Sequence, residues 1–75
     1  MKLWIDTTRE APKGWIWCTS IVDAKDAFIE LYSHLEEISL APDQSIYIDF
    51  LDWVELLQDY YPNDFNTHEI SIHNH

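Results

Sequence analysis

The chain has 75 residues, 47% of them hydrophobic and 15% aromatic, which suits one single domain (1–75) near the lower size limit for a self-supporting core. Fourteen acidic residues against four Lys and Arg give a formal net charge of -10, which excludes direct binding to nucleic-acid phosphates or to an anionic membrane surface. The single cysteine, Cys18, excludes an internal disulfide and a cysteine-based zinc site, so we expect a protein of the reducing cytoplasm.

The first two predicted elements are short strands. Residues 2–6 form an apolar run that ends in a carboxylate, and residues 15–18 form an aromatic run typical of a strand. The polar segment between them contains Pro12 and ends at Gly14, which predicts a loop. The aromatic run would bury Cys18 as a small apolar side chain.

A helix is predicted to begin directly after the second strand. Ser20 stands three residues before Asp23, the spacing at which a hydroxyl caps a free backbone N–H and a carboxylate reaches back. Apolar residues then recur at three- and four-residue steps to about residue 34: Ile21, Ala24, Phe28, Leu31 and Leu35. This spacing predicts an amphipathic helix.

The second half of the chain repeats the alternation of strand and helix. Residues 37–40 predict a third strand, which Pro42 ends because proline removes a ladder donor. A second helix is predicted from about residue 44 or 45 to Tyr60, with Pro62 closing it. Its expected buried stripe consists of Tyr47, Phe50 or Leu51, Val54, Leu57 and Tyr61.

The last predicted element is a strand within residues 68–75. Ile70 and Ile72 alternate there with polar residues, which indicates a half-buried strand at the edge of a sheet. The sequence therefore predicts an α/β fold with a small sheet of about four strands and two helices, in the order β-β-α-β-α-β.

These residues resemble a known family. The runs KLWID, TTRE, EEISL, YIDFLDW and EISIH are similar to those of the receiver-like domains named for cyclic-phosphate processing. The resemblance covers almost the whole chain and implies a receiver-like sheet. In the family, acidic residues follow the first and third strands and a histidine lies in the last one. The matching positions here are Asp6, Asp43 and His73, whereas Thr7, Ala41 and Pro42 replace further family residues.

Two interpretations of these three residues stay open. Carboxylates at the ends of parallel strands suit Mg²⁺, and an imidazole could position a water, so Asp6, Asp43 and His73 are the candidate catalytic residues of an enzyme. Alternatively they are remnants, with Asp6 paired to Arg9 and Asp43 capping the second helix. Under the second interpretation the protein needs no cofactor.

The C-terminal histidines offer a weaker metal hypothesis. His73 and His75 share a face of the predicted strand and could touch Zn²⁺ or Ni²⁺, but we expect a frayed terminus. The sequence shows no Ser/His/Asp arrangement, and one glycine in the chain excludes a phosphate-binding loop. We therefore predict no metal site among these histidines.

The acidic residues of the helices are the most specific feature. Asp49, Asp52, Glu55 and Asp59 lie within about a third of the second helix's circumference at 100° per residue. Asp23, Asp26 and Glu30 do the same on the first helix. Neighbours at this spacing are ~5–6 Å apart, of the same order as phosphates along a nucleic-acid strand, and their repulsion costs helix stability. The alternative interpretation is a solvated face.

Two main functional hypotheses follow. The first is a non-catalytic inhibitor, a DNA mimic of the kind bacteriophages use, which occupies a basic, nucleic-acid-binding surface of a host protein. Exposed aromatics would add apolar contacts: Trp4, Trp17, Trp53, Tyr60 and Tyr61. The second is a metal-dependent phosphatase or cyclic-nucleotide-processing enzyme that uses Mg²⁺. A homodimer is a side prediction, and a plain scaffold subunit is a third possibility.

Overall fold

The computed structural model describes residues 1–75 as one four-stranded parallel sheet with two α-helices. The sheet has the order β2-β1-β3-β4, with β1 at Lys2–Ile5, β2 at Ile16–Cys18, β3 at Glu37–Leu40 and β4 at Ser71–Asn74. Helix α1 (Ile21–Leu31) continues into the short 3₁₀ helix η1 (Tyr32–His34), and α2 spans Ser45–Tyr60. The predicted α/β class and the element order β-β-α-β-α-β are confirmed.

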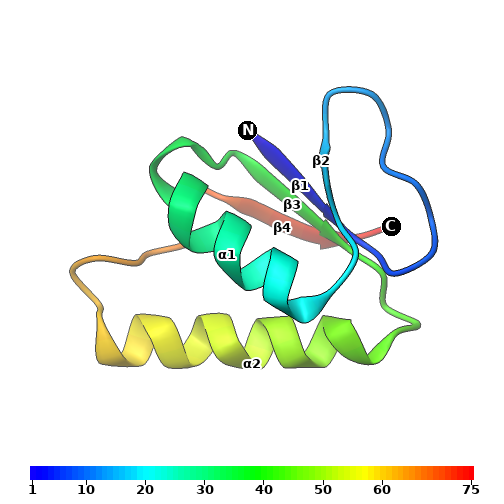
Figure 1. Ribbon diagram of the computed structural model, residues 1–75. Helices are drawn as coiled ribbons and strands as arrows, with labels where there is room; N and C mark the ends of the chain where they lie inside the picture. The colour runs from blue at the N-terminus through cyan, green and yellow to red at the C-terminus, as the bar shows by residue number, and fades with distance from the viewer.

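Both helices lie on the same side of the sheet (Figure 1). The chain crosses from β2 to β3 through α1 and from β3 to β4 through α2, and both steps run across the sheet in the same direction. Because crossovers between parallel strands are right-handed, two such steps place their helices on one face. The β1–β2 connection steps the other way and contains no helix, so the second face has no helical cover.

The core fills the space between the helices and the sheet. Alternate strand residues point to opposite faces, so Leu3 and Ile5 of β1 face the helices. Phe28 of α1 meets the ring of Phe50 of α2 edge-on, with 5.9 Å between the ring centroids. The buried apolar cluster comprises Leu3, Ile5, Cys18, Ala24, Phe28, Leu35, Ile38, Leu40, Ile46, Phe50, Val54 and Ile70.

The start of α1 agrees with the prediction, whereas the end of α2 differs. The Ser20 hydroxyl accepts a hydrogen bond from the Asp23 backbone N–H at 3.1 Å, as expected of an N-cap. The predicted reciprocal bond is not formed, because the Asp23 carboxylate lies 3.4 Å from the Thr19 hydroxyl and does not reach back to Ser20. Tyr61, predicted in the buried stripe of α2, is 56% exposed. It is the C-cap, with φ -132° and ψ 60°, so the helical period no longer directs its side chain. Ile46, outside the predicted stripe, is buried instead.

The two remaining segments are the turn at Gly14 and the chain leading into β4. Gly14 has φ +90°, a conformation that favours glycine, and it lets the loop turn back into β2. Residues 68–70 form a turn rather than the start of the predicted strand, so β4 is shorter than expected. Neither helix combines the length and the apolar composition needed to cross a membrane.

Candidate functional site

Asp6 is the centre of a hydrogen-bonded network at the carboxyl end of β1. Its side chain is buried, yet one carboxylate oxygen accepts from the backbone N–H groups of Thr8 and Arg9 at 2.8 and 2.7 Å. The Thr8 hydroxyl and the Gln44 amide donate to the same oxygen at 3.3 and 2.9 Å. The other oxygen is contacted by Arg9 Nη1 at 3.0 Å and by His75 Nε2 at 2.9 Å. Both oxygens of the Asp6 carboxylate are therefore hydrogen-bonded within the protein.

The network keeps Asp6 ionised. Burial by itself raises the pKa of Asp6, but the hydrogen bonds from the Arg9 backbone and the His75 side chain, with those from Thr8 and Gln44, hold the pKa well below its ordinary value. A buried charge is tolerated only when it is paired and hydrogen-bonded, and this one is both. Asp6 thus fixes the position of the loop that follows β1.

Arg9 joins the two predicted site carboxylates. Its guanidinium pairs with Asp6 and also makes two bonds to Asp43, from Nη1 at 3.1 Å and from Nη2 at 2.6 Å. The Arg9 hydrogen bond lowers the pKa of Asp43, and the Asp43 hydrogen bond raises the pKa of Arg9. The guanidinium occupies the space between the carboxylates where the receiver-like resemblance would put a divalent ion.

Asp43 does not cap α2, although a cap was one of its predicted roles. The N-cap position belongs to Gln44, and no side chain makes a capping hydrogen bond there. The Gln44 side chain is instead turned toward the loop after β1, where its amide oxygen accepts from the Thr7 N–H at 2.8 Å. The other expectation for this region, an Asp6–Arg9 ion pair, is confirmed.

His75 contradicts the expectation of a frayed terminus. Its ring is stacked on Trp4, with centroids 3.6 Å apart and planes 11° from parallel. Its Nδ1 lies 2.7 Å from the Ser39 hydroxyl, and its Nε2 lies 2.9 Å from the Asp6 carboxylate. The register of the parallel sheet produces this arrangement, since the backbone N–H of His75 also bonds to the Leu40 carbonyl at 3.1 Å.

Ser39, His75 and Asp6 therefore form the Ser/His/Asp chain that sequence analysis did not find. Its residues are 36 and 69 positions apart, so only the strand register reveals it. The Ser39 side chain is 0% exposed beneath the histidine, where a substrate has no access to its hydroxyl. Ser39 and Asp6 contact the two ring nitrogens of His75 from opposite sides and so fix the orientation of the imidazole.

His73 does not join the Asp6 network. Its Nε2 lies 2.5 Å from the Glu37 carboxylate of β3, and its ring meets Trp15 edge-on with centroids 6.5 Å apart. Lys2 completes this second charge group, 3.8 Å from the other Glu37 oxygen. Of the three candidate catalytic residues, the structure brings Asp6 and Asp43 together and places His73 elsewhere.

The His73–Glu37 pair makes stability depend on pH. The Glu37 hydrogen bond raises the pKa of His73 above its ordinary value. A raised pKa stabilises the fold fully below the unfolded value of about 6.5, and the gain is lost as pH rises through the folded pKa. We expect His73→Gln to lower the free energy of unfolding at about pH 5 and to have less effect at about pH 9.

The measurement is urea unfolding of both proteins across this pH range. His68→Gln is the matched control, because the exposed His68 side chain makes no hydrogen bond. An effect of His73→Gln that grows with pH, or that His68→Gln reproduces, would contradict the role of the pair.

Aromatic and imidazole rings cover the sheet face that lacks a helix. Trp4 stacks on His75 and meets Trp15 edge-on at 5.7 Å, and the Lys2 ammonium lies 5.5 Å from the Trp15 ring centre. A cation over an indole face is attracted by the ring quadrupole. This layer of side chains closes the second face in place of a helix.

The layer limits which aromatics remain free for a partner. Trp4 is packed within it, and Trp53 packs against the core. Trp17, Tyr60 and Tyr61 are exposed, although the Trp17 ring N–H is tied to the Asp6 carbonyl at 2.8 Å. Of the five aromatic residues predicted to be exposed, Tyr60 and Tyr61 at the end of α2 are the two that are exposed and whose side chains make no hydrogen bond.

The acidic stripe of α2 (Asp49, Asp52, Glu55 and Asp59) is fully displayed. All four residues are exposed, and none forms an ion pair. On α1, Asp26 and Glu30 are also exposed and unpaired, whereas Asp23 takes part in the N-terminal cap, with Thr19 Oγ1 3.4 Å from its carboxylate. The α2 stripe therefore carries the larger set of free carboxylates.

No Lys or Arg of the chain forms an ion pair with the stripe. Lys2 pairs with Glu37, and Arg9 pairs with the two aspartates described above. Lys25 of α1 lies 5.7 Å from the ring centre of Trp53. No Lys or Arg occurs in α2, so nothing in the stripe's own helix neutralises it.

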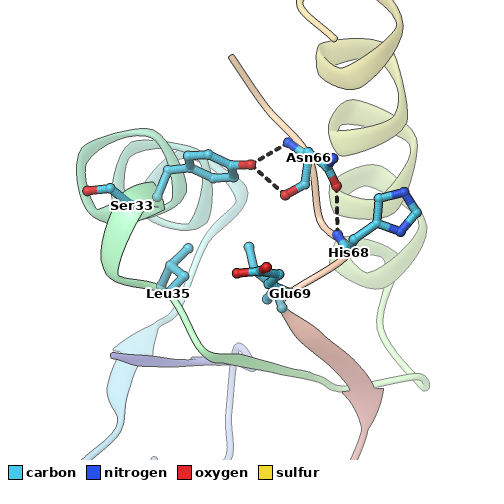
Figure 2. Close-up of a pocket in the computed structure, with 7 residues that line it drawn as sticks. Ser33, Leu35, Asn66, His68 and Glu69 are labelled. Atoms are coloured by element: carbon cyan, nitrogen blue, oxygen red, sulfur yellow. Dashed lines mark hydrogen bonds between the residues drawn. The ribbon is translucent and has the colours of Figure 1, made fainter. Parts of the chain in front are cut away.

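The surface has two shallow hollows. One, of about 330 Å³, lies at the amino ends of β3 and β4 (Figure 2). There the Tyr32 hydroxyl bonds to the backbone N–H and carbonyl of Asn66, and the Asn66 side chain accepts from the His68 N–H at 2.8 Å. These polar groups hold the loop before β4 against η1. The second hollow lies on α2 and is lined by Asp52, Glu55, Leu56 and Asp59.

Comparison of the chain with protein-family models, curated proteins and solved structures found no match. The receiver-like family thus stays a prediction from the sequence, while the parallel α/β fold is shown by the structure.

Proposed function

We propose that this protein is a non-catalytic binding protein that uses the acidic stripe of α2 to occupy a basic, nucleic-acid-binding surface of another protein. The observation that carries the proposal is that all four stripe carboxylates are exposed and without ion pairs. Unneutralised carboxylates attract a cationic surface and steer it during association.

The positions of the carboxylates fit a surface that normally holds phosphates. With a rise of 1.5 Å per residue, Asp49 and Asp59 are about 15 Å apart along the helix axis, with Asp52 and Glu55 between them. Successive charges are thus spaced by roughly 5–6 Å. A protein that neutralises a row of phosphates with Lys and Arg would meet a similar row of charges here.

The enzyme hypothesis draws less support from the same geometry. Both carboxylate oxygens of Asp6 already make hydrogen bonds to protein groups. Arg9 already provides a positive charge between Asp6 and Asp43. A Mg²⁺ ion would have to displace the guanidinium before it could reach either carboxylate. A hydrolysis of phosphate esters that requires Mg²⁺ and is lost in Asp43→Asn but not in the stripe variant would favour the enzyme.

The proposal is tested by affinity capture from a bacterial lysate. The stripe variant combines Asp49→Asn, Asp52→Asn, Glu55→Gln and Asp59→Asn. The control combines Glu10→Gln, Glu36→Gln, Asp64→Asn and Glu69→Gln at other exposed positions. Each changes the formal charge from -10 by four to -6, so the two variants have the same net charge. Of the eight substituted residues, Glu36 alone has an ion-pair partner, the N-terminal ammonium at 3.6 Å.

We expect the unmutated protein and the control to retain a nucleic-acid-binding protein that high salt or duplex DNA releases. The stripe variant should retain at least about ten-fold less of it, because each lost charge pair weakens a desolvated contact. Equal capture by the stripe variant, or capture that DNA does not compete, would overturn the proposed function.

A further inference from the structure

The outward side of α2 carries apolar side chains among its carboxylates. Ile48, Asp52, Leu56 and Tyr60 follow each other at four-residue steps and form what we call the outer ridge of α2. Ile48 is 60%, Leu56 54% and Tyr60 76% exposed. Residues at four-residue steps are neighbours on a helix surface and form one of the rows along which helices pack.

Carboxylates flank this ridge on both sides. At 100° per residue, Asp49 lies about 60° from Asp52 on one side, and Glu55 lies about 60° away on the other. Asp59 lies about 20° from Asp52, on the side of Glu55. An apolar row bordered by acidic residues is suited to pack against a second helix whose own apolar row is bordered by basic residues.

We propose that the outer ridge of α2 binds a basic amphipathic helix of the partner protein. This rests on the proposed function and specifies the element that the acidic stripe recognises. Apolar residues of the partner helix pack on Ile48 and Leu56, and its Lys or Arg residues pair with the flanking carboxylates. The hollow beside Leu56, lined by Asp52, Glu55 and Asp59, receives the apolar stem of such a side chain while its charged end reaches a carboxylate.

A second copy of the chain does not fit this surface. Pairing two outer ridges would bring two rows of carboxylates together, and α2 has no cation to separate them. A partner contact through charge alone would leave Ile48 and Leu56 uncovered. The exposed face of α1 is a poorer candidate, because it is shorter and contains the partly buried Lys25.

The test uses two synthetic peptides of about 14 residues, a length that covers the outer ridge from Ile48 to Tyr60. One places Leu on a single helical face with Lys elsewhere. The other has the same composition with its leucines spread around the helix. Fluorescence anisotropy of the labelled peptides gives Kd, and amide chemical-shift changes in the unmutated protein locate the contact. We expect the amphipathic peptide to bind at least about ten-fold tighter and to shift α2 amides.

The variant Ile48→Ser/Leu56→Ser should abolish this preference while both peptides keep their salt-dependent binding. The matched control is Val22→Ser/Ile29→Ser, two α1 positions with similar exposure of 62% and 53%, which should preserve the preference. Circular dichroism checks that both variants stay folded.

Equal affinity for the two peptides, shift changes centred away from α2, or a preference that survives Ile48→Ser/Leu56→Ser would overturn the inference. Those results would leave the proposed function standing, because it depends on the stripe charges and on the capture experiment. Loss of the proposed function would show in equal capture by the stripe variant.

Discussion

Asp6→Ala is expected to lower the free energy of unfolding by about 3 kcal/mol or more. The substitution would remove the acceptor for the N–H groups of Thr8 and Arg9 and for the side chains of Gln44 and His75. These bonds are part-buried, so donors left without a partner regain hydration only in part, and the buried Asp6 side chain leaves a cavity. Urea unfolding at neutral pH, followed by tryptophan fluorescence, measures the change.

The control for this prediction is Asp26→Ala, which removes an exposed carboxylate that makes no ion pair. Its effect should stay within about 0.5 kcal/mol. A loss below about 1 kcal/mol for Asp6→Ala would show that the network is not what holds the end of β1. Asp6→Asn separates charge from shape, since the amide keeps one acceptor but turns N–H groups toward existing donors.

Phe28→Ala is expected to cost about 3–5 kcal/mol of unfolding free energy. The buried Phe28 ring meets four others, with centroids 5.4 Å from Tyr32, 5.9 Å from Phe50, 5.5 Å from Trp53 and 6.1 Å from Phe65. Removing it opens a cavity between both helices and the loop before β4. A chain of this size has a total stability of roughly 4–11 kcal/mol, so the variant should be largely unfolded when warmed.

Thermal unfolding by circular dichroism checks this prediction. Ile29→Ala in the same helix is the matched control, because Ile29 is exposed and alanine favours the helix. It should leave Tm nearly unchanged. A Phe28→Ala protein as stable as Ile29→Ala would mean that the aromatic cluster is not the centre of the core.

The fold could be predicted from the sequence because its signals are local. The Ser20–Asp23 cap and the spacing of Ala24 and Phe28 define α1 without knowledge of the rest of the chain. The prediction was wrong for Tyr61, where the helical period was continued one residue beyond the last helical one. Helix ends depend on capping geometry, which a periodic pattern does not contain.

The Asp6 network could be predicted only in part. The Asp6–Arg9 pair spans three residues and follows from the sequence, but the contacts with Gln44 and His75 span 38 and 69 residues. They depend on which strands are neighbours and on their register. A cue existed in the alternation of β4, where His73 and His75 share a face, but the expected fraying of the terminus hid it.

The charged residues that hold the end of β1 are separate from the exposed residues of α2. Asp6 and Arg9 share no hydrogen bond or ion pair with any residue of the outer ridge of α2. Substitutions at sites without common partners act additively on stability. Substitutions on the surface of α2 are therefore expected to leave unchanged the stability that the Asp6 network provides.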